Sequence, residues 1–216
     1  MHETSYRAMK HLLEILVPHA NGTPISILDV GSQVAEPGQQ SYREIIAGLG
    51  NATYTGLDVT PGDNVDVVAT NGYEFPVESE SFDFVISGQA FEHIEFPWLT
   101  IKEMARALKA GGMAVVIAPS SGYEHRYPLD CWRYYPDGMR ALGKWAELDC
   151  IASITNWHET KLFLWGDTVG VFHKPRADNA HDDIPDLRID ELERMYRSLR
   201  PGLVEALRWF YMRWRQ

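Results

Sequence analysis

Two aspartates that accompany short apolar runs are the first residues whose types and spacing suggest chemistry. Asp29 lies near the end of the run Ile25–Val30, just before Gly31, and Asp58 lies near the end of a second run that begins at Tyr54. A near-continuous run of Ile, Leu and Val is typical of a parallel strand that is buried on both faces. A carboxylate at the end of the second such strand can accept hydrogen bonds from both hydroxyls of a ribose. The two acids therefore predict a nucleotide-like ligand at the carboxyl ends of the strands.

Two histidines are candidates for moving a proton. His93 follows the apolar run Phe82–Ser87, where a strand is expected to end, and His125 lies in a later polar segment. A hydroxyl that acts as a nucleophile must lose its proton, and a histidine or a carboxylate is the usual base. We therefore predict His93 and His125 as catalytic residues. The plain alternative for His93 is a helix-start histidine that bonds only to the backbone.

A long segment between Ser120 and Gly138 mixes aromatic residues with a histidine, acids and arginines. A connection of this length inside a compact domain is usually functional. Sugar rings stack on aromatic faces, and guanidinium groups bind phosphate or carboxylate. We predict that Tyr127, Asp130 and Arg133 bind a polar, sugar-like substrate. The alternative is a surface loop that its aromatic residues fold over the sheet.

Predicted strands alternate with predicted helices along the chain. Strands are expected at 25–30, 54–59, 65–69, 82–87, 113–118, 148–154 and 169–172, with a further segment at 157–164 between the last two. Helices are expected at 3–17, 41–49, 98–108, 137–145, 190–200 and 203–214. This alternation favours an α/β fold, specifically a Rossmann-like, doubly wound and mostly parallel seven-stranded sheet flanked by helices.

The composition changes near residue 175, which predicts a domain over 1–175 and a linker with a C-terminal helical extension over 176–216. The last predicted helix places Phe210, Tyr211 and Trp214 near one face, with arginines beside them. Such a helix suits a membrane surface, a second subunit as in a homodimer, or its own domain. The sequence leaves these three possibilities open.

Composition excludes several classes of function. The 216 residues are 45% hydrophobic and 23% charged, with a formal net charge of −10, so a nucleic-acid partner is not expected. The two cysteines, Cys131 and Cys150, have no metal-type spacing, and no metal ligand is predicted. The first ten residues lack the apolar core of a signal peptide, and no apolar run approaches the roughly 18 residues of a membrane span. We expect a cytoplasmic protein with no transmembrane segment.

Four stretches, taken in order, resemble one family. They are Ile27-Leu28-Asp29-Val30-Gly31; Gly56-Leu57-Asp58; Phe75-Pro76 with Ser81–Ser87 and Phe91-Glu92-His93-Ile94; and Glu103–Gly112. Together they cover roughly residues 25–119. The set is similar to the class I S-adenosylmethionine-dependent methyltransferases of the small-molecule type, with a type 11-like domain. The G-x-G-x-x-G fingerprint of a nicotinamide dehydrogenase is absent after the first strand.

The resemblance implies S-adenosyl-L-methionine as the cofactor. It assigns cofactor binding to Asp29, Gly31, Ser32, Asp58, Val59, Asn71, Ser87 and Gln89. Ser32, Gln33 and Val34 stand where the family usually has further glycines, and Ser32 and Gln33 can donate hydrogen bonds instead. Asn71 stands where the family often has an acid near the adenine amino group.

The predicted function is methyl transfer to a small polar acceptor, specifically a hydroxyl of a sugar or glycosylated metabolite. The sequence does not separate this from transfer to nitrogen or carbon, because the nucleophile belongs to the acceptor. A catalytically weak or non-catalytic binding module on the same fold is the alternative. Its support is the altered glycine loop and the C-terminal extension.

Overall fold

The computed structural model describes residues 3–17, 24–35, 38–155, 166–177, 184 and 186–198. Its helices are α1 (Glu3–Leu16), α2 (Tyr42–Gly48), the short 3-10 helix η2 (Phe91–His93), α3 (Pro97–Ala107), α4 (Pro136–Trp145) and α5 (Ile189–Ser198). Its strands are β1 (Ile25–Val30), β2 (Ala52–Asp58), β3 (Val67–Val68), β4 (Phe82–Gly88), β5 (Leu108–Ser121), β6 (Asp149–Thr155) and β7 (Gly166–His173).

The strands form one seven-stranded sheet in the order β3-β2-β1-β4-β5-β7-β6. Strand β7 runs antiparallel to both of its neighbours, and the other pairings are parallel. This confirms the predicted fold class. The strand order reverses between β1 and β4, and ligands of open α/β sheets bind outside the carboxyl ends of the strands at such a point.

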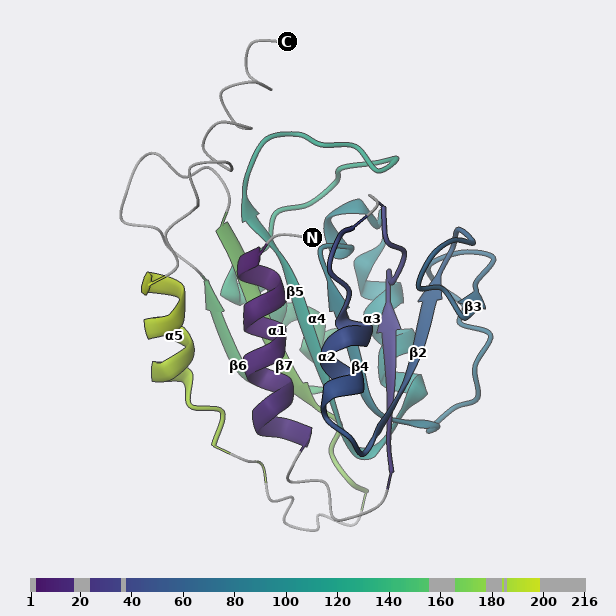
Figure 1. The fold of residues 1–216 in the computed structure, drawn as a ribbon, viewed down its shortest axis with the longest axis horizontal. Coiled ribbons are helices and arrows are strands. Elements are labelled where there is room, and N and C mark those ends of the chain that lie inside the picture. Colours follow the sequence, from purple (N-terminus) through teal and green to yellow (C-terminus); the bar gives the residue numbers. More distant parts are fainter. Residues whose placement is uncertain are drawn as a thin grey trace.

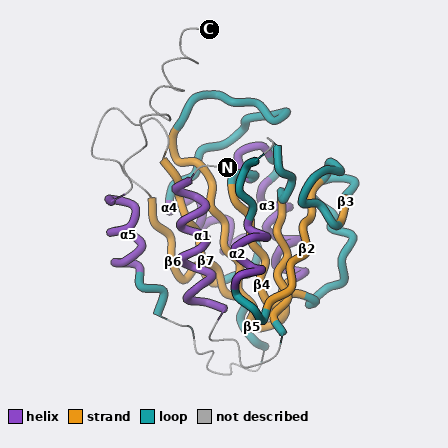
Figure 2. The backbone as a smooth tube through the Cα atoms, viewed as in Figure 1, coloured by secondary structure: helices purple, strands orange, loops and turns teal. Residues whose placement is uncertain are grey.

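Helices cover both faces of the sheet (Figures 1 and 2). Successive residues of a strand point to opposite faces, so Ile27 packs in the core under α1 and α2, whereas Leu28 packs in the core under α3 and α4. Both residues are fully buried. The continuous apolar runs of the sequence therefore follow from burial on two faces.

Two predicted boundaries differ in the structure. Helix α3 ends at Ala107, and β5 already begins at Leu108, whereas the sequence predicted a strand only from residue 113, after Gly111 and Gly112. Leu108 is fully buried and pairs with Phe82 of β4, so sheet pairing extends the strand through the glycines. The strand predicted at 65–69 is reduced to Val67–Val68, which pairs only with the end of β2.

The start of the C-terminal extension packs onto the domain. Leu187 and Leu192 are buried in the same core cluster as α1, and α5 contacts α1. The predicted helix at 203–214 and the segment at 157–164 lie outside the described residues. Among the described helices, none combines the length and the apolar character that crossing a bilayer requires.

Candidate active site

The predicted cofactor residues come from four strands that are neighbours in the sheet. Asp29, Gly31 and Ser32 belong to the end of β1; Asp58 and Val59 to the end of β2; Asn71 follows β3; Ser87 and Gln89 belong to the end of β4. Because these strands are parallel and lie side by side in the order β3-β2-β1-β4, all eight residues lie at one edge of the sheet. The structure thus brings together residues that the sequence separates.

Gly31 makes the sharp turn after β1. Its φ is +79°, a conformation that favours glycine, and a Cβ built there would lie 2.4 Å from the Cβ of Ala90. The backbone N–H groups of Gly31 and Ser32 both donate to the carbonyl of Leu57. The turn is therefore fixed to the end of β2 and cannot accept a side chain.

The Asp58 carboxylate is partly accessible at the end of β2. The N–H of Gln33 donates to its Oδ2 at 3.1 Å, and the N–H of Thr60 donates to its Oδ1 at 3.0 Å. Each carboxylate oxygen can accept a further hydrogen bond. Val59 beside it is 51% exposed and offers an apolar surface. This arrangement suits a ligand that presents two hydroxyls next to a flat apolar ring.

Asp29 has a different environment. Its side chain is buried, and Tyr54 Oη donates to Asp29 Oδ2 at 2.6 Å. Burial, reinforced by the charge of Asp58, raises the pKa of Asp29 to about 7. Tyr54 Oη in turn accepts from Asn64 Nδ2, and Arg43 Nε donates to Asn64 Oδ1. No sequence pattern indicated this network, because its members come from β1, β2, α2 and a loop.

Ser32 and Gln33 turn toward the loop after β2. Ser32 Oγ donates to the carbonyl of Asn64 at 3.2 Å, and Gln33 Nε2 donates to the carbonyl of Pro61 at 3.4 Å. Asn64 Nδ2 returns a hydrogen bond to the carbonyl of Ser32. We expected these two side chains to donate hydrogen bonds to a cofactor. In the structure they donate to the 61–64 loop instead. Their role in cofactor binding stays a prediction.

Ser87 and Gln89 at the end of β4 bond to other strands, Ser87 to the adjacent β1 and Gln89 to β7, which lies beyond β5. Ser87 is fully buried, and its hydroxyl donates to the carbonyl of Val30 in β1. Gln89 Nε2 donates to Asp167 Oδ1 at 3.0 Å, while Thr4 Oγ1 donates to Asp167 Oδ2 at 2.7 Å. Asp167 at the start of β7 was missed by the sequence reasoning. It brings the first turn of α1 to the same edge of the sheet.

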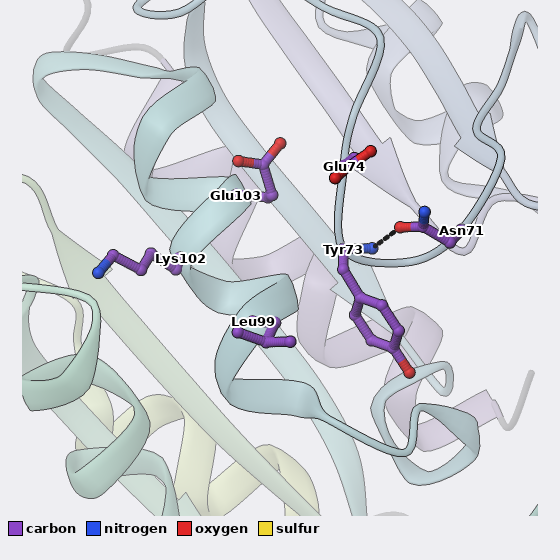
Figure 3. Close-up of a pocket in the computed structure, with 6 residues that line it drawn as sticks. All are labelled: Asn71, Tyr73, Glu74, Leu99, Lys102 and Glu103. Carbon is purple, nitrogen blue, oxygen red and sulfur yellow. Dashed lines mark hydrogen bonds between the residues drawn. The ribbon is translucent and has the colours of Figure 1, made fainter.

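Asn71 forms a tight turn in which its Oδ1 accepts the N–H of Tyr73 at 2.8 Å (Figure 3). An open pocket of about 420 Å³ adjoins this turn, and Leu99, Lys102 and Glu103 of α3 line its other side. In Figure 3 the Lys102 side chain extends away from Asn71. Asn71 is the one predicted cofactor residue in this lining, so the pocket lies beside the predicted cofactor edge.

The two predicted catalytic histidines lie next to each other. The ring centroids of His93 and His125 are 5.0 Å apart, edge to face. Nδ1 of His93 lies 2.5 Å from the carbonyl of Leu129, and Nδ1 of His125 lies 3.1 Å from the carbonyl of Tyr123. A carbonyl only accepts, so each Nδ1 carries a proton and each Nε2 has a lone pair in the neutral ring.

Glu92 lies in the family-like stretch Phe91-Glu92-His93-Ile94, but the sequence did not predict it as a site residue. Its side chain is 1% exposed, and the Nε2 atoms of His93 and His125 lie 3.6 Å and 3.8 Å from its Oε1. Neither carboxylate oxygen of Glu92 has a hydrogen-bond partner among the described residues. The adjacency of Glu92 and His93 was visible in the sequence, whereas the approach of His125 was not.

The segment between β5 and α4 is a long loop beyond the upper ends of the strands in Figure 1. Arg133 forms a bidentate pair with Asp130, which also accepts the N–H of His125. The hydrogen bonds from Arg133 lower the pKa of Asp130 to about 2. Tyr127 is 57% exposed. Asp130 and Arg133 therefore brace the loop, and substrate binding by Tyr127, Asp130 and Arg133 stays a prediction.

Comparison with known proteins agrees with this geometry. Residues 28–116 match the family described as "Methyltransferase domain". This stretch of the chain is similar to a methyltransferase domain. An "Uncharacterized methyltransferase" of Mycobacterium ulcerans (strain Agy99) is 28% identical over 137 residues, which cover 56% of this chain and 49% of that protein. A Mycobacterium avium (strain 104) relative with the same description is also 28% identical, with 50% of its length covered. The chain thus spans about half the length of the curated relatives it matches.

Solved structures share the fold of this chain. Phosphoethanolamine N-methyltransferase 2 of Haemonchus contortus, in complex with S-adenosyl-L-methionine, has a TM-score of 0.56 at 14% identity, covering 79% of this chain and 53% of that one. The [4+2]-cyclase SpnF has a TM-score of 0.58 at 14% identity, covering 78% and 80%. These matches confirm the predicted resemblance at the level of the fold. A cyclase among them shows that the fold does not by itself fix the reaction.

Proposed function

We propose that this chain is an S-adenosylmethionine-dependent methyltransferase that acts on a hydroxyl of a small, polar, sugar-like acceptor. The observation that carries the proposal is Asp58. Within a methyltransferase domain, its carboxylate stands at the end of β2 beside the switch point, with hydrogen-bonding capacity left on both oxygens. That is what a ribose with two hydroxyls requires.

The residues at this edge fit the cofactor. Asp58 would accept hydrogen bonds from the ribose hydroxyls, and Val59 would cover one face of the adenine. Asn71 keeps its Nδ2 for an adenine nitrogen, since its Oδ1 is used in the turn with Tyr73. Asp29, once ionised, would compensate the positive charges of the methionine portion from beneath the turn at Gly31.

Bound S-adenosylmethionine supplies a methyl group that is activated by its sulfonium. The chain's own task is then to orient the acceptor, to exclude water and to remove a proton. His93 or His125, each with an unprotonated Nε2, can accept the proton of an acceptor hydroxyl. Glu92 would stabilise the imidazolium that results, because its buried carboxylate lies within 4 Å of both rings.

The loop between β5 and α4 supports a sugar-like acceptor. Tyr123, Tyr127 and Trp132 are 37%, 57% and 39% exposed, so each offers an aromatic surface on which a sugar ring can stack. Arg126 in the same loop is exposed and pairs with the exposed Glu124. An acidic group on the acceptor would find a cation there.

The alternative is a binding module that has lost catalysis. The observation behind it is that Ser32 and Gln33 use their side-chain donors on the 61–64 loop. A homodimer through the C-terminal extension would belong to the same hypothesis. Cofactor affinity separates this alternative from the enzyme.

The test is calorimetric titration of the chain with S-adenosylmethionine and S-adenosylhomocysteine. We expect micromolar binding that Asp58→Ala weakens about tenfold or more, equivalent to roughly 1.4 kcal/mol. Asp63→Ala is the matched control, because Asp63 is an exposed carboxylate in the next loop. If neither ligand binds the wild type, or if Asp58→Ala binds as Asp63→Ala does, the proposed site is wrong. A screen of sugar acceptors by release of S-adenosylhomocysteine then tests the substrate class.

A further inference from the structure

We propose that Glu92, His93 and His125 form a binding site for a divalent transition-metal ion of the zinc type. One atom from each residue lies within 4.8 Å of the other two. Two imidazoles and one carboxylate are the ligands of many zinc sites, in which a fourth position stays open to water or substrate. The site goes beyond the proposed function and does not require it.

The distances suit an ion at the centre of the three residues. Ligands about 2.1 Å from a tetrahedral ion lie about 3.4 Å from each other. The observed separations from Glu92 Oε1 are 3.6 Å to His93 Nε2 and 3.8 Å to His125 Nε2. Both lie beyond hydrogen-bond distance, so the carboxylate and the rings face one another without bonding directly. A small inward shift would complete the coordination.

The Nδ1 atom of each histidine faces a backbone carbonyl, as it does in many metal-bound histidines. A ligating imidazole binds the ion through one nitrogen and donates its other N–H to a carbonyl or carboxylate. Nδ1 of His93 faces the carbonyl of Leu129, and Nδ1 of His125 faces the carbonyl of Tyr123, with Asp130 Oδ2 at 3.4 Å. These contacts direct both Nε2 atoms toward Glu92.

The burial of Glu92 is a second, independent observation. Its side chain is 1% exposed, yet both of its oxygens are without a hydrogen-bond partner among the described residues. A buried carboxylate is costly unless a charge compensates it. The nearby Arg133 is already engaged in a bidentate pair with Asp130. Glu92 raises the pKa of His125, and a divalent ion would compensate the carboxylate while both histidines stay neutral.

The surrounding contacts hold the ligands in place. The backbone carbonyl of Glu92 accepts the N–H groups of Cys131 and Trp132, which ties the loop to η2. Tyr134 Oη donates to the carbonyl of Phe91. The loop that carries His125, the third ligand, is therefore fixed to η2. With the ion bound, both Nε2 lone pairs are ligands, so neither histidine serves as the base. In a role that rests on the proposed function, the ion would take over that task, because an acceptor hydroxyl bound to it would lose its proton more readily.

The test is metal titration of the full chain after treatment with a chelator and dialysis. We expect one Co²⁺ per chain, with the visible absorption of a four- or five-coordinate site, and displacement by Zn²⁺. Mg²⁺ should not displace Co²⁺, because two of the three ligands are nitrogen. Glu92→Gln and His125→Ala should each weaken Co²⁺ binding about tenfold or more.

Glu124→Gln is the matched control, since Glu124 is an exposed carboxylate next to His125 in the chain. Thermal unfolding of each variant checks that it is folded, and His125→Ala changes a side chain that is 36% exposed and is not part of the core. Absence of stoichiometric Co²⁺ binding to the wild type would overturn the site, as would equal binding by Glu92→Gln, His125→Ala and Glu124→Gln.

Cofactor titration of the same samples keeps this inference separate from the proposed function. Glu92→Gln should still bind S-adenosylhomocysteine, and Asp58→Ala should still bind Co²⁺. Metal binding without cofactor binding would leave the metal site standing and refute the methyltransferase proposal. Cofactor binding without metal binding would refute the metal site and leave the methyltransferase proposal standing.

Discussion

At the scale of single residues, similar sequence patterns lead to different chemistry. Asp29 and Asp58 both lie near the ends of apolar runs, but Asp58 is partly accessible, whereas Asp29 is 3% exposed and bonded to Tyr54. The difference arises because Asp29 belongs to a central strand and Asp58 to a strand nearer the edge. The sequence predicted both acids as cofactor ligands. Only the structure shows that Asp29 is buried.

Asp29 leads to a prediction about pH. Its folded-state pKa of about 7 lies above the ordinary value of 3.8, so the folded protein retains a proton that the unfolded chain has lost between these pH values. The free energy of unfolding should therefore fall as pH rises from about 4 to 7, by up to roughly 1.4 kcal/mol per pH unit from this group, and then level off. Asp29→Asn should lack this contribution.

Urea unfolding of the wild type and of Asp29→Asn, at several pH values between 4.5 and about 8.5, measures the pH dependence of the free energy of unfolding. The difference between the two proteins isolates the contribution of Asp29 from those of other titrating groups. Asparagine can still accept the hydrogen bond from Tyr54. Parallel pH dependences in the two proteins would contradict the prediction.

At the scale of elements, polar contacts determine the conformation of the loop between β5 and α4. The Asp130 side chain is 2% exposed and accepts from both terminal nitrogens of Arg133 as well as from the N–H of His125. Arg133 also donates to the carbonyl of Tyr123. One ion pair thus joins both ends of the segment 123–133 and sets where His125 lies.

Replacing Arg133 with lysine should loosen this loop. Lysine keeps the positive charge but cannot make the paired hydrogen bonds of a guanidinium. We expect a loss of about 1–2 kcal/mol in local stability and correspondingly faster amide hydrogen exchange over residues 123–132. Arg126→Lys is the control, because Arg126 and its partner Glu124 are both exposed. Equal exchange in the two variants would show that the Asp130–Arg133 pair does not order the loop.

At the scale of the whole molecule, the two hydrophobic cores differ in which part of the chain supplies their last residues. The core under α3 and α4 draws on residues from Leu28 to Phe172. The core under α1 and α2 also includes Leu187 and Leu192, so the first part of the C-terminal extension belongs to the folded unit. The predicted division at residues 175 and 176 remains a prediction about domains, but α5 does not stand apart from α1.

Truncating Leu192 tests this packing. Leu192 is fully buried, so Leu192→Ala should lower the free energy of unfolding by about 2–4 kcal/mol. Ile184→Ala, at a position that is 43% exposed, should change it by no more than about 0.5 kcal/mol. Urea unfolding followed by tryptophan fluorescence measures both, with one transition expected in each case. A Leu192→Ala midpoint equal to that of Ile184→Ala would mean that α5 adds nothing to the core.

The sequence by itself determined the class of fold, most strand positions and the edge of the sheet at which the predicted cofactor residues meet. Burial on two faces requires continuous apolar runs, and the acids, Gly31 and the family motif adjoin those runs, so this information is local. The tertiary structure decided the Tyr54–Asp29 bond, the early start of β5 and the meeting of His125 with Glu92 and His93. These contacts depend on which strands pair and on how a long loop folds back. They join residues that lie far apart in the chain at no regular spacing, so no sequence periodicity indicates them.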